Sequence, residues 1–420
     1  MLLQSTSLYK KLQKRYSRRI NLDLNRINKV LYKFNNPHLS LVNPINILGS
    51  DGKMSVLTSL KYFLESGKKN TTAFTSPHLY DFRHRIWLKD NYISIKKIKT
   101  LIKLIEKKKL KLTLFELLTC VYILAAKELK NISYNLVESG LLFKKDSTNL
   151  WLNPKAQIVT NINFQHQDWV NPKTLKEICR QKVGSLSKNT TIYISKQKTK
   201  TLRIIKKILN NNPSKIIYPS HWRIKNVKDI YYYIDKTNKI LIKNKHIKSK
   251  ALVENLGLAI KVALDLGVSK KTIINTIPKI KFEGRVQYIK KGNLINVIHK
   301  NEKLLVDGCH SIESAKNLHN YLNTLNLPIY GILGMKKNKL PEKFIKVFKN
   351  SIKKIYTVNI PNEPNSIQAS KLKLICENQN FDAEISKSVT DALKKISNKK
   401  KKIIIIFGSL YLVGDVLKKN

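Results

Sequence analysis

Residues 45–55 read Ile-Asn-Ile-Leu-Gly-Ser-Asp-Gly-Lys-Met-Ser, and they join an apolar run to a stretch with helical spacing that continues to Glu65. A glycine-bracketed turn between a buried strand and a helix start is suited to nucleotide phosphates, because backbone N–H groups and the helix N-terminus attract anions. Lys53 would add a positive charge, and the Ser55 hydroxyl could bind Mg²⁺. The usual pattern puts Ser or Thr directly after the Lys, whereas Met54 intervenes here. An ordinary glycine turn therefore explains this loop about as well.

Segments typical of strands and helices alternate along the chain. The predicted strands are residues 45–48, 71–75, 134–137, 156–160, 191–194, 304–306, 329–333, 354–358 and 402–407, and the predicted helices include 94–106, 114–128, 252–266, 312–325 and 389–397. This order predicts an α/β protein with mostly parallel sheets, in which ligands bind beyond the carboxyl ends of strands.

The length of 420 residues predicts two domains, because it exceeds what one hydrophobic core usually organises. A break near Lys281–Arg285 separates the halves. We predict an N-terminal phosphate-loop ATPase-type domain with a mostly parallel sheet over residues 1–283, and a smaller C-terminal Rossmann-like α/β domain over residues 284–420. An N-terminal helix ended by Asn35-Asn36-Pro37 is predicted from the helical spacing of Leu12, Ile20, Leu22, Leu24, Ile27, Val30 and Leu31.

The composition bounds the partners and the compartment. A formal charge of +53 raises nucleic acid as a partner. The lysines are spread through almost every segment, however, so we interpret them as a solvated surface and do not expect nucleic acid to bind. No apolar run is long enough to cross a bilayer. The four cysteines are widely scattered, which favours free thiols. We therefore expect a cytoplasmic protein without membrane contact.

Three further residues gain interest from their position relative to the phosphate loop. Glu138 follows the strand 134–137, where a carboxylate can reach a metal bound to phosphates. His166 lies just past the strand 156–160, and Lys182 lies in a helix-like segment. Taken singly, each is more often a cap, a structural histidine or one surface lysine among many. Only their combination makes them candidates for a site.

Short motifs in one consistent order connect these residues. They are Arg19–Ile27 as an opening helix, Gly49–Ser55 (GTNGKGS), Thr75–Leu79 (TSPHL), Leu112–Glu116 (LTFFE), Glu138 with Asp146–Asn149 (EVGLGGRLDATN), His166–Trp169 (DHTDWLG), Arg180–Gly184 (REKAG), Asn255, Gly284–Gln287 (PGRFQ), Asp307–Ser311 (DGAHN) and Gly408–Gly414 (GSLYLVG). Through them the chain resembles the folylpolyglutamate synthase/dihydrofolate synthase family, within the Mur-ligase-like amide ligases. The letters in parentheses give the usual form of each motif in that family.

The resemblance implies ATP-dependent amide-bond formation. A carboxylate of dihydropteroate or of a reduced folate would attack the γ-phosphate of ATP, and the α-amine of L-glutamate would displace phosphate from the resulting acyl phosphate. ATP and two Mg²⁺ ions are the implied cofactors, and a monomer is the expected state. Because the site would draw on both domains, closure would exclude water from the acyl phosphate.

The resemblance also assigns residues by position. It places Gly49, Asp51, Gly52, Lys53, Ser55, Asn255, Arg285 and Asp307 on ATP; Ser55, Glu138, His166 and Lys182 on the metals; Ser76, His78, Thr113, Phe115 and Asp146 on the folate; and His310, Ser409 and Tyr411 on glutamate. Lys53, a carbamylated Lys182 and His310 would act in catalysis. Core packing accounts equally for Phe115, and a strand-end turn accounts for Asp307, Ser409 and Tyr411 about as well.

Several positions depart from the family motifs. They are Asp51, Met54, the segment Leu142–Lys144 in place of Gly-Gly-Arg, Ser311, and the segment 334–340, which lacks two acidic residues. An inactive or monofunctional relative therefore stays open as an alternative. A plain phosphate-loop ATPase or kinase would turn over ATP without glutamate, and a peptidoglycan-precursor ligase should lack the folate-side motifs. Retention of Thr113, Phe115 and Asp146 favours activity on both dihydropteroate and reduced folates.

Overall fold

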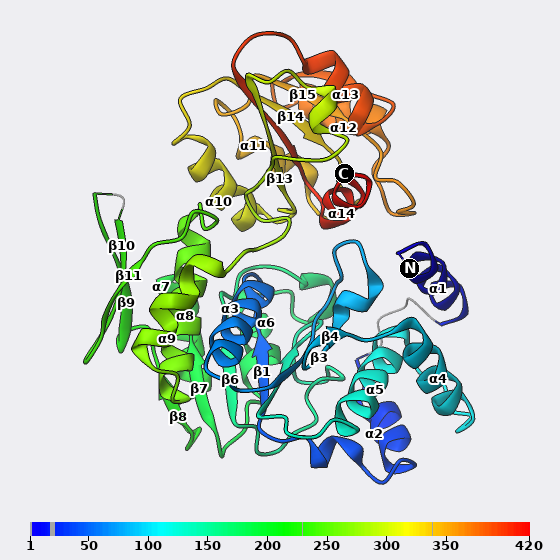
Figure 1. The fold of residues 1–420 in the computed structure, drawn as a ribbon, viewed down its shortest axis with the longest axis vertical. Helices are drawn as coiled ribbons and strands as arrows, with labels where there is room; N and C mark the ends of the chain where they lie inside the picture. The colour runs from blue at the N-terminus through cyan, green and yellow to red at the C-terminus, as the bar shows by residue number, and fades with distance from the viewer. Residues whose placement is uncertain (1, 17–21, 229, 338) are drawn as a thin grey trace. The chain divides into compact units, whose positions relative to one another are not determined.

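The computed structural model describes residues 2–16, 22–228, 230–337 and 339–420 (Figure 1). The chain packs into two compact units, and each is described by itself. The first contains Met1–Asn244 and Leu252–Ile280, and the second contains Lys245–Ala251 and Lys281–Asn420. The division into two functional domains at residue 283 stays a prediction.

Among the described residues, the first unit is built on an eight-stranded sheet with the order β4-β3-β2-β5-β1-β6-β7-β8. Its strands are β1 (Pro44–Leu48), β2 (Thr71–Phe74), β3 (Ile86–Leu88), β4 (Asn91–Tyr92), β5 (Tyr134–Glu138), β6 (Ala156–Val159), β7 (Thr191–Ile194) and β8 (Lys215–Ile217). Strands β3 and β4 form an antiparallel edge, and the others run parallel. The mostly parallel sheet is thus confirmed. Strands β3, β4 and β8 were not predicted, since two or three residues carry almost no periodic signal.

Strands β1 and β5 are buried along their whole length, as expected for a parallel sheet that helices cover on both faces. These helices are α3 (Lys53–Ser66), α4 (Ile95–Glu106), α5 (Leu114–Lys127), α6 (Leu175–Val183), α7 (Thr199–Ile208), α8 (Lys250–Asp265) and α9 (Lys270–Thr276). One face packs Phe74 and Val137 against α4 and α5, and the same face packs Leu48 and Val159 against α6 and α7. Helix α3 packs across β1, β2 and β5 and contacts α9.

The N-terminal region forms two helices, α1 (Leu2–Arg15) and α2 (Leu24–Tyr32). The predicted helical N-terminus is confirmed, but it is divided: the Asp23 side chain accepts a hydrogen bond from the N–H of Asn25 and starts a second helix there. Ile20 and the Arg19–Asn21 part of the predicted opening helix lie outside the described residues. The predicted end is confirmed, since Asn35 and Asn36 take positive φ values of 58° and 49°.

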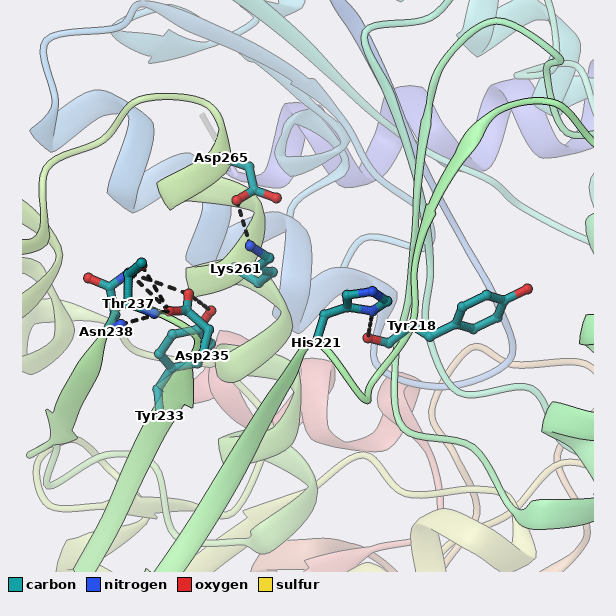
Figure 2. Close-up of polar contacts among 8 residues, drawn as sticks. All are labelled: Tyr218, His221, Tyr233, Asp235, Thr237, Asn238, Lys261 and Asp265. Carbon is teal, nitrogen blue, oxygen red and sulfur yellow. Dashed lines mark hydrogen bonds and ion pairs between the residues drawn. The ribbon is translucent and has the colours of Figure 1, made fainter.

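A small antiparallel sheet, which the sequence pattern did not predict, packs on α8. Its strands are β9 (Trp222–Val227), β10 (Ile230–Asp235) and β11 (Lys239–Ile242). A Cβ at Gly257 of α8 would lie 2.6 Å from Ile224, so the missing side chain allows this close packing. Figure 2 shows how the Asp235 carboxylate closes the β10–β11 turn, accepting from the Tyr233 hydroxyl at 2.7 Å and from the N–H of Asn238 at 2.7 Å.

In the described part of the second unit, a six-stranded sheet has the order β12-β13-β17-β14-β15-β16. Its strands are β12 (Gln287–Ile289), β13 (Glu302–Asp307), β14 (Ile329–Leu333), β15 (Lys354–Thr357), β16 (Asp382–Ile385) and β17 (Lys402–Phe407), and its helices are α10 (Ile312–Leu322), α11 (Pro341–Lys346), α12 (Ala369–Glu377), α13 (Val389–Ile396) and α14 (Leu410–Lys419). All strands but β12 run parallel, which confirms the predicted α/β architecture. None of the described helices in either unit is both long and apolar enough to span a membrane.

Candidate active site

The phosphate loop has the strand–turn–helix setting that its sequence predicts. β1 ends at Leu48 and α3 begins at Lys53, so Gly49–Gly52 form the turn. A Cβ at Gly49 (φ 140°) would lie 2.1 Å from the Thr160 hydroxyl, and one at Gly52 (φ 92°) would lie 2.5 Å from the Asn255 side chain. Both positions therefore need glycine. The structure also brings Asn255, on α8, directly against the loop.

The lysine of the loop folds back over it. Lys53 Nζ donates to the carbonyl oxygens of Gly49 and Ser50, each at 3.2 Å. Ser55 lies in the first turn of α3 and is buried. A primary amine and a hydroxyl thus flank the positive end of α3, an arrangement that favours an anionic group at this place.

Lys182 extends from α6 to the same loop. Its side chain is 1% exposed, and its Nζ donates to the Gly49 carbonyl at 2.9 Å. Burial and then the charge of Lys53 lower the pKa of Lys182 to about 7, although the carboxylates of Asp146 and Asp51 oppose this shift. A large fraction of the amine is therefore neutral near pH 7. The neutral amine is the nucleophilic form, as carbamylation by carbon dioxide requires.

The segment after β6 is joined to the phosphate loop by several hydrogen bonds. The N–H groups of Ser50 and Asp51 donate to the Asn161 carbonyl at 2.8 and 3.2 Å. The Asp51 carboxylate accepts from the side-chain amides of Asn163 at 2.6 Å and of Gln165 at 2.9 Å. His166 follows directly, with a left-handed backbone (φ 63°). The predicted metal-side histidine is thus carried by a segment anchored to the loop.

Glu138 lies at the same edge of the sheet. It is the last residue of β5 and pairs with Ile47 of β1, two residues before the loop. Its side chain is 3% exposed, and one carboxylate oxygen accepts from the N–H of Ser76 at 3.1 Å. The segment that begins at Ser76 therefore contacts the carboxyl end of β5.

The predicted metal ligands do not form a complete magnesium site by themselves. Among the described residues, no three His, Cys, Asp or Glu side chains gather to hold a metal ion. The set contributes the Ser55 hydroxyl and the Glu138 carboxylate, which are oxygen ligands of the kind Mg²⁺ prefers, together with His166 and Lys182. Mg²⁺ commonly takes one or two carboxylates plus substrate phosphates. The donors therefore fit ions that are held jointly with nucleotide phosphates.

On the predicted folate side, the side chains have clear structural roles. Thr113 begins α5 with a capping box, in which the Glu116 carboxylate accepts from the N–H of Thr113 at 2.7 Å. The Phe115 ring lies over Gly140, where a Cβ would come within 2.7 Å of it. Asp146 is buried, which raises its pKa, and it accepts from the N–H of Leu141 at 2.8 Å. These contacts bring Phe115 and the 140–146 segment together.

His78 belongs to a segment that α1 holds in place. Its Nδ1 accepts from Arg85 at 3.0 Å, and its ring lies edge-on to Tyr9 at 4.5 Å. Burial and then Arg85 lower the pKa of His78 well below its usual value. Nearby, the Ser5 hydroxyl of α1 donates to Asp81 at 2.6 Å. The sequence pattern did not predict these contacts of α1.

One departure from the family motif is accommodated by the backbone. Leu142 stands at the first glycine of Gly-Gly-Arg and keeps a left-handed conformation (φ 55°). Its side chain and that of Phe143 are buried in the core beside α6 and α7. The apolar replacement thus adds core packing, at a conformational cost of about 1 kcal/mol.

The predicted residues of the second unit meet at the carboxyl ends of β13 and β17. Asp307 accepts from the N–H of Val286 at 2.8 Å, and burial raises its pKa against the opposing charge of Arg285. His310 Nδ1 lies 2.9 Å from the Gly308 carbonyl. The Ser409 hydroxyl caps α14. Asp307 therefore also stabilises the turn at the end of its strand, which is the structural alternative predicted for it.

Tyr411, in the first turn of α14, has a cationic neighbour. Lys336 Nζ lies 4.7 Å from the centre of the Tyr411 ring and 3.4 Å from the Glu363 carboxylate. Lys336 belongs to the segment 334–340, which departs from the family motif. Asn338 of that segment lies outside the described residues.

Comparisons with known proteins agree with the resemblance found in the sequence. A family described as dihydrofolate synthetase, C-terminal domain, matches residues 290–419. The dihydrofolate synthetase of Saccharomyces cerevisiae is 24% identical over 423 residues, covering 95% of this chain and 98% of the yeast protein. The matching family, the curated relatives and the solved structures all support a likeness to the folylpolyglutamate synthase/dihydrofolate synthase family. This is a family of ATP-dependent glutamate ligases.

Solved structures share the fold of this ligase over nearly its whole length. E. coli FolC in complex with DHPP and ADP has a TM-score of 0.84 at 19% identity, covering 98% of this chain and 96% of that chain. The bifunctional folylpolyglutamate synthase/dihydrofolate synthase from Yersinia pestis, complexed with AMPPNP and Mn ion, has a TM-score of 0.84 at 18% identity, covering 98% and 97%. These likenesses confirm the predicted α/β fold of the ligase.

Some residues around the phosphate loop of the ligase were not found by sequence reasoning. Thr160, Asn163, Gln165 and Gln197 position the loop and the segment after β6. Their position just past β6 and β7 was the available signal, because ligand-side residues gather at the carboxyl ends of parallel strands. In so asparagine-rich a chain, single amides did not stand out.

Proposed function

We propose that this ligase joins L-glutamate to dihydropteroate and to reduced folates through an acyl phosphate. A carboxylate oxygen of the pterin substrate attacks the γ-phosphorus of ATP, and the bond from that phosphorus to ADP breaks. The α-amine of glutamate then attacks the acyl carbon, inorganic phosphate leaves, and the amine loses a proton. The product is an amide, and one ATP is cleaved for each bond formed.

The observation that carries the proposal is the meeting of three separate segments at the phosphate loop. Lys182 donates to Gly49, Asp51 contacts the segment that bears His166, and Glu138 pairs with the strand that leads into the loop. In this proposal Gly49, Gly52 and Ser55 surround the ATP phosphates, with Lys53 moving from the loop carbonyls to the phosphates. Preorganised charges of this kind stabilise a transferring phosphoryl group.

Ser55, Glu138, His166 and a carbamylated Lys182 would hold the two magnesium ions together with the nucleotide. The ions would neutralise charge on the phosphoryl oxygens. Carbamylation would convert the buried amine into an anion, and the lowered pKa of Lys182 supports this by keeping much of the amine neutral. The protein itself needs to supply little acid–base chemistry.

The remaining roles are assigned by position in the family motifs. Ser76, His78, Thr113, Phe115 and Asp146 would contact the pterin substrate, and Asn255, Arg285 and Asp307 would contact ATP. His310, Ser409 and Tyr411 would bind glutamate and the acyl phosphate. The first unit would then serve nucleotide and folate, and the second would serve mainly glutamate.

Two observations bear on the choice of pterin substrate. The yeast relative and the C-terminal family are both named for dihydrofolate synthetase, which supports addition of the first glutamate to dihydropteroate. The bifunctional name of the Yersinia pestis protein supports addition to reduced folates as well. Retention of Thr113, Phe115 and Asp146 agrees with both.

The test is a purified-protein assay with ATP, Mg²⁺, labelled glutamate and either dihydropteroate or tetrahydrofolate. We expect a labelled folate product with each pterin and ADP release that depends on glutamate. Lys53→Ala should lose product formation with both pterins. ADP release without labelled product would contradict the proposal and favour a plain ATPase, and product from one pterin alone would restrict it to that activity.

A further inference from the structure

The Asp51 carboxylate links two segments that are far apart in the sequence. One of its oxygens accepts hydrogen bonds from both Asn163, at 2.6 Å, and Gln165, at 2.9 Å. Asp51 is the third residue of the phosphate loop, and Gln165 directly precedes His166. An ionised carboxylate only accepts hydrogen bonds, and each amide offers N–H donors, so the three groups match chemically.

The segment after β6 is fixed independently on its other side. Gln197, which follows β7, accepts from the N–H of Ile162 at 2.9 Å and donates to the Thr160 carbonyl at 3.0 Å. Ser50 adds a contact to the main chain of Asn163 at 3.2 Å. The side chain of Asp51 therefore completes a set of contacts that joins the phosphate loop to a segment held by β7.

We propose that Asp51 is a positioning residue that holds the His166 segment against the phosphate loop before nucleotide binds. This inference rests on the proposed function only in taking the loop as the nucleotide site. Through the contacts to Asn163 and Gln165, the site is assembled in advance, so nucleotide binding need not order it. Preorganisation of this kind raises affinity.

The alternative is that Asp51 is only a tolerated negative charge beside a phosphate site. The two ideas predict opposite signs for Asp51→Asn. A mere repulsive charge, once removed, would let ADP bind more tightly. Loss of a charge-assisted contact that assembles the site should instead weaken ADP binding about fivefold.

The experiment measures ADP affinity by calorimetry on the full chain, with and without Mg²⁺, for a double-mutant cycle. Gln165→Glu places a carboxylate against Asp51 and should weaken binding more than tenfold. The double variant D51N/Q165E restores one donor and one acceptor and should return to within about threefold of wild type. Asp90→Asn, in the exposed β3–β4 turn, is the control for loss of one negative charge, and it should bind as wild type does.

A second measurement does not depend on ligand. Hydrogen exchange of a peptide covering residues 161–166 in the nucleotide-free protein should be faster in Asp51→Asn than in wild type, and unchanged in Asp90→Asn. If Asp51→Asn does not fold, Gln165→Ala tests the same contact by both readouts.

Tighter ADP binding by Asp51→Asn, additive effects in the cycle, or unchanged hydrogen exchange would each overturn the positioning role. Absence of ADP binding by the wild-type protein would instead overturn the proposed function.

Discussion

Replacing Lys182 with methionine should stabilise the nucleotide-free protein and abolish ligase activity. The amine is fully buried, and its pKa falls from 10.5 to about 7. Burial of this group therefore disfavours folding by about 4 kcal/mol at pH 7. Methionine removes that cost and fills a similar volume. It loses the hydrogen bond to Gly49, worth about 1 kcal/mol, while Lys53 still donates to the same carbonyl. The net gain should be about 3 kcal/mol.

The pH dependence of this gain follows from the same pKa. Between about pH 7 and 10.5 the unfolded chain binds more protons at Lys182 than the folded chain does, so wild-type stability rises with pH in this window. The advantage of Lys182→Met should therefore shrink from pH 7 to pH 9.5.

The assay is urea unfolding followed by tryptophan fluorescence, in buffers freed of carbon dioxide so that Lys182 stays unmodified. All four tryptophans lie in the first unit, so the signal reports the unit that contains Lys182. A Lys182→Met protein less stable than wild type at pH 7, or a difference that does not shrink with pH, would refute the reasoning. It would show that Lys182 is a stabilising structural lysine.

Three further predictions concern other parts of the molecule. Gly49→Ala should abolish nucleotide binding and lower the melting temperature, because the new Cβ would lie 2.1 Å from a hydroxyl in a left-handed backbone; calorimetry with ADP and thermal unfolding check this. Burial raises the pKa of Asp81, but hydrogen bonds from a neighbouring arginine and from Ser5 outweigh it and hold this pKa at about 2. The stabilisation that the ionised carboxylate gives above pH 4 should therefore fall by about 1 to 2 kcal/mol as the pH drops toward 2. Ser5→Ala should reduce this loss, as measured in acid-unfolding curves. Lys336→Met should raise KM for glutamate several-fold with little change in KM for ATP, since it removes the cation beside Tyr411; initial rates at varied glutamate decide this, and an equal effect on both KM values would contradict it.

The parallel sheets and the phosphate loop were predictable because their signals are local. An apolar run, two glycines and a helical spacing fix the path from β1 to α3, and Glu138 follows from the end of a buried strand. The small sheet β9–β11 was not predictable, because its outer face carries Lys225 and Lys239 beside apolar residues, and the pattern resembles the lysine-rich surface elsewhere. Its position depends on packing against α8, which the strand pattern itself does not show.

The candidate site was predictable in its residues but not in its connections. The sequence places Asp51 in the loop and His166 after β6, yet it gives no sign that Gln165 donates to Asp51. The motif likewise points to Lys182, but the sequence does not show that this lysine is buried or that it contacts Gly49. Side-chain pairing across more than a hundred residues depends on tertiary packing, which a single sequence does not specify.

The acyl phosphate is tested most directly by oxygen transfer. Dihydropteroate labelled with ¹⁸O in its carboxylate would be incubated with the ligase, ATP, Mg²⁺ and glutamate, and the released phosphate would be analysed by mass spectrometry. We predict one ¹⁸O atom in the inorganic phosphate for each amide formed, because the attacking carboxylate oxygen leaves with phosphorus. Product formation with unlabelled phosphate would contradict the account.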